Sequence, residues 1–146
     1  MAITTNAIAN SFKKELLEAK HNFTQTSGDQ FKIALYTSSA TLGKSTTSFT
    51  TDHQVSNSGQ YTTGGGKLAK GSQQTSVASS VAIVDFADRS FTGVTLTARG
   101  ALIYNTSNSN TAVAVLDFGG DKTATAGTFT IQFPAFTTSA AILRIS

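Results

Sequence analysis

The sequence predicts a mainly β protein, an antiparallel β-sandwich or jelly roll with one N-terminal α-helix and one long extended loop. The first reason is composition, because 17 serines and 24 threonines make up 41 of the 146 residues, glycine adds 12, and proline occurs once. Such a composition favours strands and turns over a helical bundle. The second reason is that short segments of alternating apolar residues follow one another after residue 80 without helical crossovers between them. A chain of this length fits one domain, 1–146, with the β-sandwich over 31–146.

An N-terminal helix is predicted over 6–21. Apolar side chains recur there at intervals of three or four residues, which aligns them in one stripe on a helix: Ile8, Phe12, Leu16, Ala19 and Phe23. Thr4, Thr5 or Asn6 has the side chain needed to cap the N-terminus. The stripe has to be covered, and the pattern fits equally a cover by the sheet of the same domain or by a neighbouring subunit.

The apolar period changes to two at Phe31, which predicts a half-buried strand over 31–36. A long stretch of serine, threonine, glycine and glutamine follows, from about 38 to 80, with isolated larger apolar residues. Structureless loops of this length are uncommon in compact domains and are usually functional or mobile. We expect a projecting loop or arm with short strands of its own, mobile in the free protein.

The remainder of the chain predicts a series of short strands separated by turn-rich joints. Their alternation places them at 81–87, 91–98, 99–105, 111–118, 129–133 and 141–145. The polar cluster TSNSN joins two of these segments and predicts a hairpin, whereas the segment GGDKTATAG predicts a loop before the next strand.

No catalytic, cofactor-binding or metal site is expected. The chain has no cysteine and two histidines, His21 and His53, which excludes zinc-thiolate and disulfide chemistry and leaves too few ligands for a histidine cage. The string GGGK at 64–67 lacks the spacing of a phosphate-binding loop and is predicted to be a flexible hinge. His53 fits a polar loop residue, and Asp117 in the triplet DFG fits a side chain that hydrogen-bonds the following loop.

Neither nucleic acid nor a membrane is an expected partner. The formal net charge is +3, but the lysines and arginines are scattered instead of clustered along one groove or helix. No apolar run approaches the length of about 18 residues that a membrane span requires.

Several segments resemble a family of small virion structural proteins of tailed bacteriophages. The resemblance rests on ANSFKKELLEAKHNF and FKIALYTSSATLG near the start, on DFAD, TLTARGALIYN and AVAVLDFGGDKT in 85–123, and on GTFTIQFPAFTTSAAILRI at the end. It covers nearly the whole chain. It implies a non-enzymatic component of the phage particle, present in many copies and located in the virion, with no catalytic residue to carry over.

Within that family resemblance we expect a capsid decoration or cement protein that stabilises the head by binding the major capsid protein, and we expect a homo-oligomer. The alternative is a tail, neck or fibre-associated structural protein that contacts the host surface. Extended segments and an apolar helix face are the features by which such proteins hold their neighbours. The candidate partner-binding residues are therefore Ile8, Phe12, Leu16, Phe49 and Tyr61.

Overall fold

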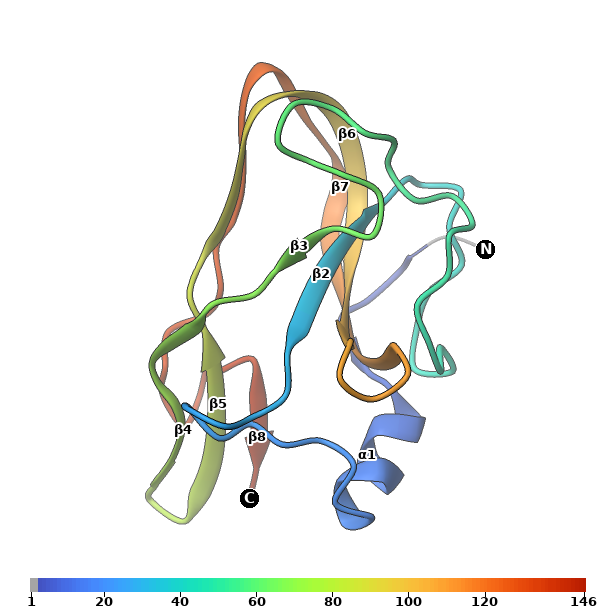
Figure 1. The fold of residues 1–146 in the computed structure, drawn as a ribbon. Coiled ribbons are helices and arrows are strands. Elements are labelled where there is room, and N and C mark those ends of the chain that lie inside the picture. Colours follow the sequence, from blue (N-terminus) through green and yellow to red (C-terminus); the bar gives the residue numbers. More distant parts are fainter. Residues whose placement is uncertain (1–2) are drawn as a thin grey trace.

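The computed structural model describes residues 3–146, with the side chains of 71–74 excepted. The chain is mainly β, as the sequence predicts, and forms a five-stranded sheet of order β1-β7-β6-β2-β3 and a three-stranded sheet of order β4-β5-β8 (Figure 1). All the strand pairs are antiparallel. The finer expectation, a sandwich or jelly roll, stays a prediction. The elements are β1 (Ala7–Ile8), α1 (Asn10–Leu17), β2 (Phe31–Tyr36), β3 (Gly66–Lys67), β4 (Lys70–Ala78), β5 (Val81–Phe86), β6 (Arg89–Asn105), β7 (Thr111–Ile131) and β8 (Leu143–Ile145).

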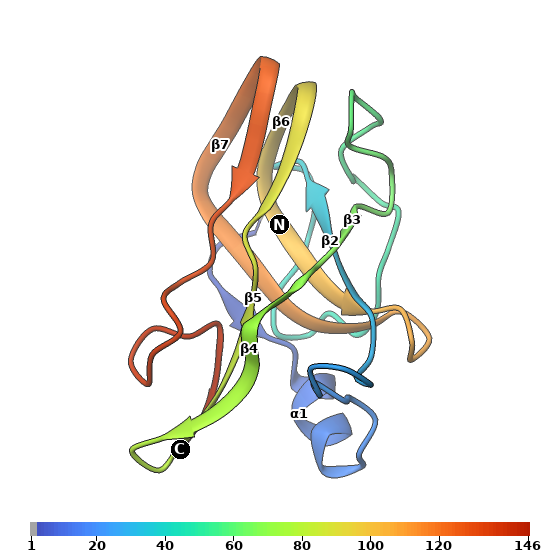
Figure 2. The same cartoon turned by 60° about the vertical axis from the view of Figure 1, so that its left-hand side comes forward.

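A long hairpin of β6 and β7 forms the centre of the five-stranded sheet. The predicted strands 91–98 and 99–105 are one strand, and the predicted loop at 119–127 is wrong because β7 continues through it. Register shifts, three of them between Phe91 and Gly100, mark bulges, which increase twist and bend a strand. Both views show the hairpin bending over at the end of the molecule farthest from α1 (Figures 1 and 2).

Strand β2 is buried on both of its faces instead of one. Its side chains at 31 and 33–36 are all buried. The long segment after β2 lies against it, because the Val55 N–H donates to the Leu35 carbonyl (2.8 Å) and the Tyr36 hydroxyl donates to the Thr50 carbonyl (2.7 Å). The segment up to Leu68 is therefore packed against the core instead of projecting as an arm, whereas the short strands expected between 38 and 80 are present as β3 and β4. The isolated apolar residues of this segment serve as anchors in the core: Ala40, Leu42, Val55, Tyr61 and Leu68.

The glycines of the string GGGK permit a close approach of two backbones. Gly65 has a φ of +81°, and a Cβ atom there would lie 1.8 Å from the Ile33 carbonyl oxygen. Gly66 then pairs with Ile33 in β3. The predicted flexible hinge is wrong, since glycine is required here for space and for a left-handed backbone conformation.

Helix α1 begins later than the predicted residue 6. Ala7–Ile8 is paired with β7, opposite Ala114 and Val115, so Ile8 lies on a strand. The N-cap is Ala9, without a side-chain hydrogen bond. The capping predicted for Thr4, Thr5 or Asn6 is wrong, because these residues precede β1, and Asn6 instead accepts a hydrogen bond from the Asp117 N–H (2.6 Å).

Helix α1 also ends four residues before the predicted residue 21. The Ala19 N–H donates to the Leu16 carbonyl (3.1 Å) and the Lys20 N–H donates to the Glu15 carbonyl (3.0 Å). This is a Schellman motif, which places Ala19 in the left-handed region with a φ of 57°. Phe23 lies outside the helix, but its side chain still packs beside the apolar stripe of α1, because its ring centroid is 6.0 Å from that of Phe12.

Replacing Ala19 with glycine is expected to stabilise the protein. Ala19 is exposed and strained in a position that glycine adopts freely, so Ala19→Gly should raise the free energy of unfolding by about 0.5–1 kcal/mol in urea denaturation. The matched control is Ala82→Gly at an exposed position within β5, which should lower it by about the same amount. Destabilisation by both changes would contradict the motif.

Alkaline unfolding is expected to coincide with tyrosine ionisation. The three tyrosines are all buried, and burial raises the pKa of Tyr61 to about 12 and also raises the pKa values of Tyr36 and Tyr104. Tyrosine side chains in the unfolded chain ionise with a pKa of about 10. The stability that the neutral, buried tyrosines contribute is therefore complete below that pH, and it is lost as the pH rises toward the higher pKa values of the folded protein.

A pH titration followed by tyrosinate absorbance and circular dichroism checks this expectation. Little tyrosinate should form around pH 10, and all three residues should then ionise together as the β-sheet signal disappears. Stepwise ionisation with an intact dichroism spectrum would show that the phenols are accessible in the folded protein.

Candidate functional site

An apolar groove of about 460 Å³ lies between α1 and the three-stranded sheet. These two elements occupy the same end of the molecule (Figures 1 and 2). One wall combines β1, α1 and the turn after the helix, and the other combines all three strands of the smaller sheet. The lining residues are Ile8, Phe12, Lys13, Leu16 and Phe23 on the first wall, and 75–77, 82–84 and Leu143–Ile145 on the second.

The sheet wall is built from side chains in register. Val77 pairs with Ala82, which pairs with Ile145, so these three residues form one row across the sheet. Side chains alternate between the faces of a sheet, and Val84 and Leu143 therefore form the next row on the same face. Val84 packs against the core and Leu143 is buried, whereas the first row lies farther out. The groove thus deepens from an exposed apolar rim to the core.

Of the exposed large hydrophobic side chains among the described residues, two of three line this groove. The three are Leu17, Val77 and Ile145, with 91%, 73% and 61% of their surface exposed. Val77 and Ile145 line the sheet wall, and Leu17 follows the groove residue Leu16 on α1. Contiguous exposed apolar surface on a soluble domain marks an interaction site more often than isolated apolar residues do.

The groove brings together three of the five predicted partner-binding residues. Phe12 is buried, and Ile8 and Leu16 are partly buried against the core. Phe49 lies elsewhere, half-buried and stacked on Tyr104 with 4.7 Å between ring centroids. The choice of Tyr61 as a contact residue is wrong, because it is fully buried in the chain's own core and its hydroxyl oxygen accepts the Leu35 N–H (2.8 Å).

Sequence reasoning missed the sheet wall. Val77 lies in the segment predicted as a loop, and Ile145 lies in a predicted terminal strand to which no role was given. Alternation along 81–87 and 141–145 indicated two of the strands, but it does not show which face of a sheet remains uncovered.

The lining of the groove includes two cationic residues, Lys13 and Arg144, and no carboxylate. Arg144 lies between Leu143 and Ile145 on β8, so its side chain is on the opposite face of the sheet and only Lys13 presents its charge on the groove side. Lys13 donates to the side-chain oxygen of Asn10 (3.3 Å), and Arg144 donates to the main-chain carbonyl of Ser139 (2.8 Å). Neither cation forms an ion pair with another described residue. The nearby acid Glu18 is engaged by Lys14 and Lys20, which lower its pKa to about 2.

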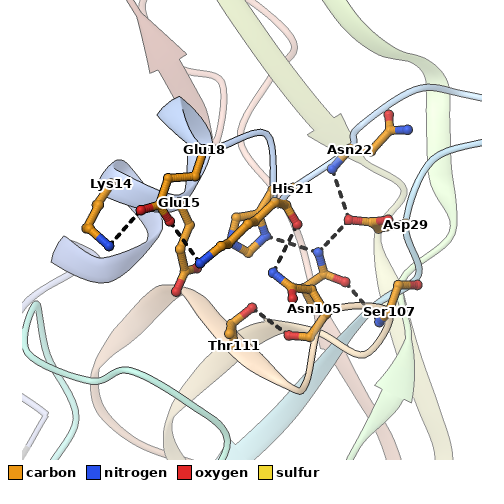
Figure 3. A network of polar contacts seen from close by, with 11 residues as sticks. Lys14, Glu15, Glu18, His21, Asn22, Asp29, Asn105, Ser107 and Thr111 are labelled. Atoms are coloured by element: carbon orange, nitrogen blue, oxygen red, sulfur yellow. Dashed lines mark hydrogen bonds and ion pairs between the residues drawn. The ribbon is translucent and has the colours of Figure 1, made fainter.

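A buried polar network fixes the end of α1 to the β6–β7 turn (Figure 3). The His21 side chain is fully buried, with Nε2 2.6 Å from a Glu15 carboxylate oxygen and Nδ1 3.0 Å from the Asn105 amide nitrogen. Asn105 also donates to Asp29 (2.7 Å) and accepts the Ser107 N–H (2.9 Å). The network thus joins the helix, the loop before β2 and the end of β6.

The hydrogen bonds of Asn105 determine the tautomer of His21. A main-chain N–H can only donate, so the Asn105 atom facing Ser107 is its oxygen and the atom facing His21 is its nitrogen. Nδ1 of His21 therefore accepts, and Nε2 carries the proton that is donated to Glu15. Both ring nitrogens are occupied, so neither is left to activate a nucleophile, and the arrangement acts as a structural clamp.

The remaining polar candidates lie apart from the groove walls described above. His53 is an exposed loop residue, as predicted. The Asp117 carboxylate accepts the Gly119 N–H (2.9 Å), as predicted, although Gly119 belongs to β7 and not to a loop, and this bond together with the Arg99 guanidinium lowers the pKa of Asp117. Within residues 3–146 no group of three or more His, Cys, Asp or Glu side chains is arranged to hold a metal ion. The same residues include no helix of the length and apolarity needed to cross a membrane.

Removal of the Asn105 side chain is expected to destabilise the protein strongly. Asn105→Ala leaves the buried Nδ1 of His21 and the part-buried Ser107 N–H without these partners, so the free energy of unfolding should fall by about 2–4 kcal/mol. The control is Asn108→Ala, whose exposed side chain donates to the Lys20 carbonyl (3.0 Å) and should cost less than about 1 kcal/mol. Equal losses in denaturant unfolding would contradict the clamp.

Comparison of the chain with protein-family models, with curated proteins and with solved structures found no match.

Proposed function

We propose that this chain is a non-enzymatic structural protein of a tailed-phage particle, a capsid decoration or cement protein that binds the major capsid protein. The observation that carries the proposal is the gathering of exposed hydrophobic side chains around one groove at one end of the molecule. A protein that attaches to a shell needs one apolar attachment surface on an otherwise polar body. The resemblance of its segments to small phage virion proteins points to the same role.

The end of the molecule opposite the groove has the polar character expected of a surface that faces away from the capsid. The hairpin bend exposes hydroxyl side chains, and Thr97 and Thr123 are hydrogen-bonded across the strands at 2.8 Å. Uncharged hydroxyl groups keep a surface solvated without attracting charged molecules. The exposed threonines of this region are Thr92, Thr95, Thr97, Thr123, Thr125 and Thr128.

The second candidate is a tail, neck or fibre-associated protein. The same threonine-rich bend favours it, because hydroxyl groups presented on a rigid hairpin suit hydrogen bonding to a host surface. In either role we propose a virion location and a homo-oligomer, with proteins as partners in place of nucleic acid or lipid. The β-sandwich or jelly-roll arrangement of the two sheets belongs to the same proposal, since rigid β domains are suited to a permanent structural role.

Copy number distinguishes the two candidates. A quantitative gel of purified particles that contain this chain should show hundreds of copies per particle for capsid decoration, on the order of the coat protein itself, since a shell repeats its binding site by symmetry. A handful to a few tens of copies would instead support the tail assignment. Complete absence of the chain from purified particles would overturn both.

A further inference from the structure

We propose that Lys32 and Lys67, which lie opposite each other on β2 and β3, bind a doubly charged phosphate group. The group is either free inorganic phosphate or a phosphate monoester carried by a larger molecule. The site lies at the β3 border of the five-stranded sheet and shares no residue with the lining of the groove. The proposal therefore goes beyond the proposed function and does not depend on it.

The register of the sheet makes the two lysines direct neighbours, although they are far apart in sequence (Figure 1). The Leu68 N–H donates to the Phe31 carbonyl (2.9 Å), so these two residues are a hydrogen-bonded pair of the antiparallel ladder. Hydrogen-bonded pairs alternate with non-hydrogen-bonded pairs, in which the side chains lie closer together. Lys32 and Lys67 form the next pair along the ladder, so their side chains leave the same face of the sheet at the closer spacing.

The two members of this pair carry the same charge. Among the paired residues of the described strands, Lys32 and Lys67 are the only pair in which both members are charged. Like charges directly opposite each other destabilise a sheet. Neither ammonium group has an ion pair or a hydrogen bond with another described residue. An anion held between them replaces this repulsion with attraction.

The open edge of β3 adds a main-chain donor. In a non-hydrogen-bonded pair, the main-chain groups of each residue point away from the partner strand. For Lys32 these groups face β6, whereas β3 is the last strand of its sheet, so the Lys67 N–H faces the open edge. No described residue accepts a hydrogen bond from this N–H. An oxyanion at the edge can therefore accept the Lys67 N–H together with the ammonium groups.

The opposite face of β3 carries a third cation. The Arg89 guanidinium packs against Gly66, where an added Cβ atom would lie 2.6 Å from both Nε and Nη2. The Nε atom is buried without a hydrogen-bond partner, and Arg89 forms no ion pair with another described residue. Successive residues of a strand face opposite sides, so Arg89 lies across the strand from the Lys67 side chain. Its charge raises the positive potential at the edge without contacting the ligand.

Charge and the number of acceptor atoms favour a phosphate dianion. Two ammonium groups and one N–H need several acceptor oxygens and two negative charges. A phosphate monoester has three such oxygens and a charge of about −1.5 to −2 at pH 7, whereas a carboxylate or a phosphodiester has one negative charge. Tyr104 lies opposite Lys32 on the other side, and its hydroxyl donates to the Gly64 carbonyl. The site is thus bounded by an uncharged side chain on one side and is open on the other.

Binding of phosphate to the purified full chain tests the proposal. Thermal unfolding is compared in sodium phosphate and in sodium chloride of equal ionic strength, near neutral pH, so that general screening by salt is the same in both. We expect a higher unfolding temperature in phosphate, because a ligand that binds only the folded chain stabilises it. In nuclear magnetic resonance spectra, phosphate should shift the main-chain amide signal of Lys67 in a saturable manner.

Variants of the two lysines give a signature with two parts. Lys67→Gln should raise the unfolding temperature in chloride, because it removes the like-charge repulsion, and it should abolish the additional stabilisation by phosphate. Lys32→Gln should act in the same way. The matched control is Lys122→Gln, at an exposed lysine of β7 that lies opposite the uncharged Ala98. This control should retain the full response to phosphate.

Further probes identify the source of the phosphate. Tighter binding of glycerol 3-phosphate than of inorganic phosphate would support a monoester, and the reverse would support free phosphate. A single-stranded oligonucleotide with a 5′-phosphate should bind several-fold more tightly than the same oligonucleotide without it. Equal affinity of these two oligonucleotides would assign the lysines to a phosphodiester backbone and overturn the proposal. Equal unfolding temperatures in phosphate and chloride, or equal effects of Lys67→Gln and Lys122→Gln, would overturn it as well.

Discussion

The burial of β2 on both faces is the constraint on which the rest of the structure depends. A strand with apolar side chains on both faces needs a cover on each of them. Here one long segment, 37–65, supplies much of that cover and is held in place by hydrogen bonds that end on Leu35 and Tyr36. The segment is rich in serine and threonine, yet its few large apolar side chains are buried in the core. A polar chain is thereby ordered by a small number of anchors.

The clamp around His21 and the pairing of β1 act together on α1. The helix has only eight residues, which is too short to be stable in isolation. Its N-terminal side continues from a strand paired with β7, and its C-terminal side is fixed through His21 and Asn105 to the end of β6. One wall of the groove is therefore fixed at both ends.

Sequence periodicity identified the elements whose signals are local. The strand at Phe31–Tyr36 is confirmed, as are the terminal strand and the TSNSN turn. The helix exists, but two of its first predicted residues, Ala7 and Ile8, form a strand instead. They pair with β7, more than a hundred residues away in sequence, and this tertiary contact overrides the local helical pattern. The predicted break at 119–127 failed because glycine and threonine were accommodated in a bent strand. The helix wall of the groove was predictable from its stripe, whereas the sheet wall depended on which face other segments leave uncovered.

The long-range pairing of β1 also determines when the groove is completed. Ala7 and Ile8 leave the ribosome early, but their partners Val115 and Ala114 are made about a hundred residues later. The β6–β7 hairpin closes around its own short turn, so it has local contacts from which folding can begin, whereas β1 and α1 have to wait. The smaller sheet likewise lacks β8 until Leu143–Ile145 are synthesised. The two walls of the groove are thus assembled only after residue 145 has been made, so a nascent chain that is shorter than this has no complete groove.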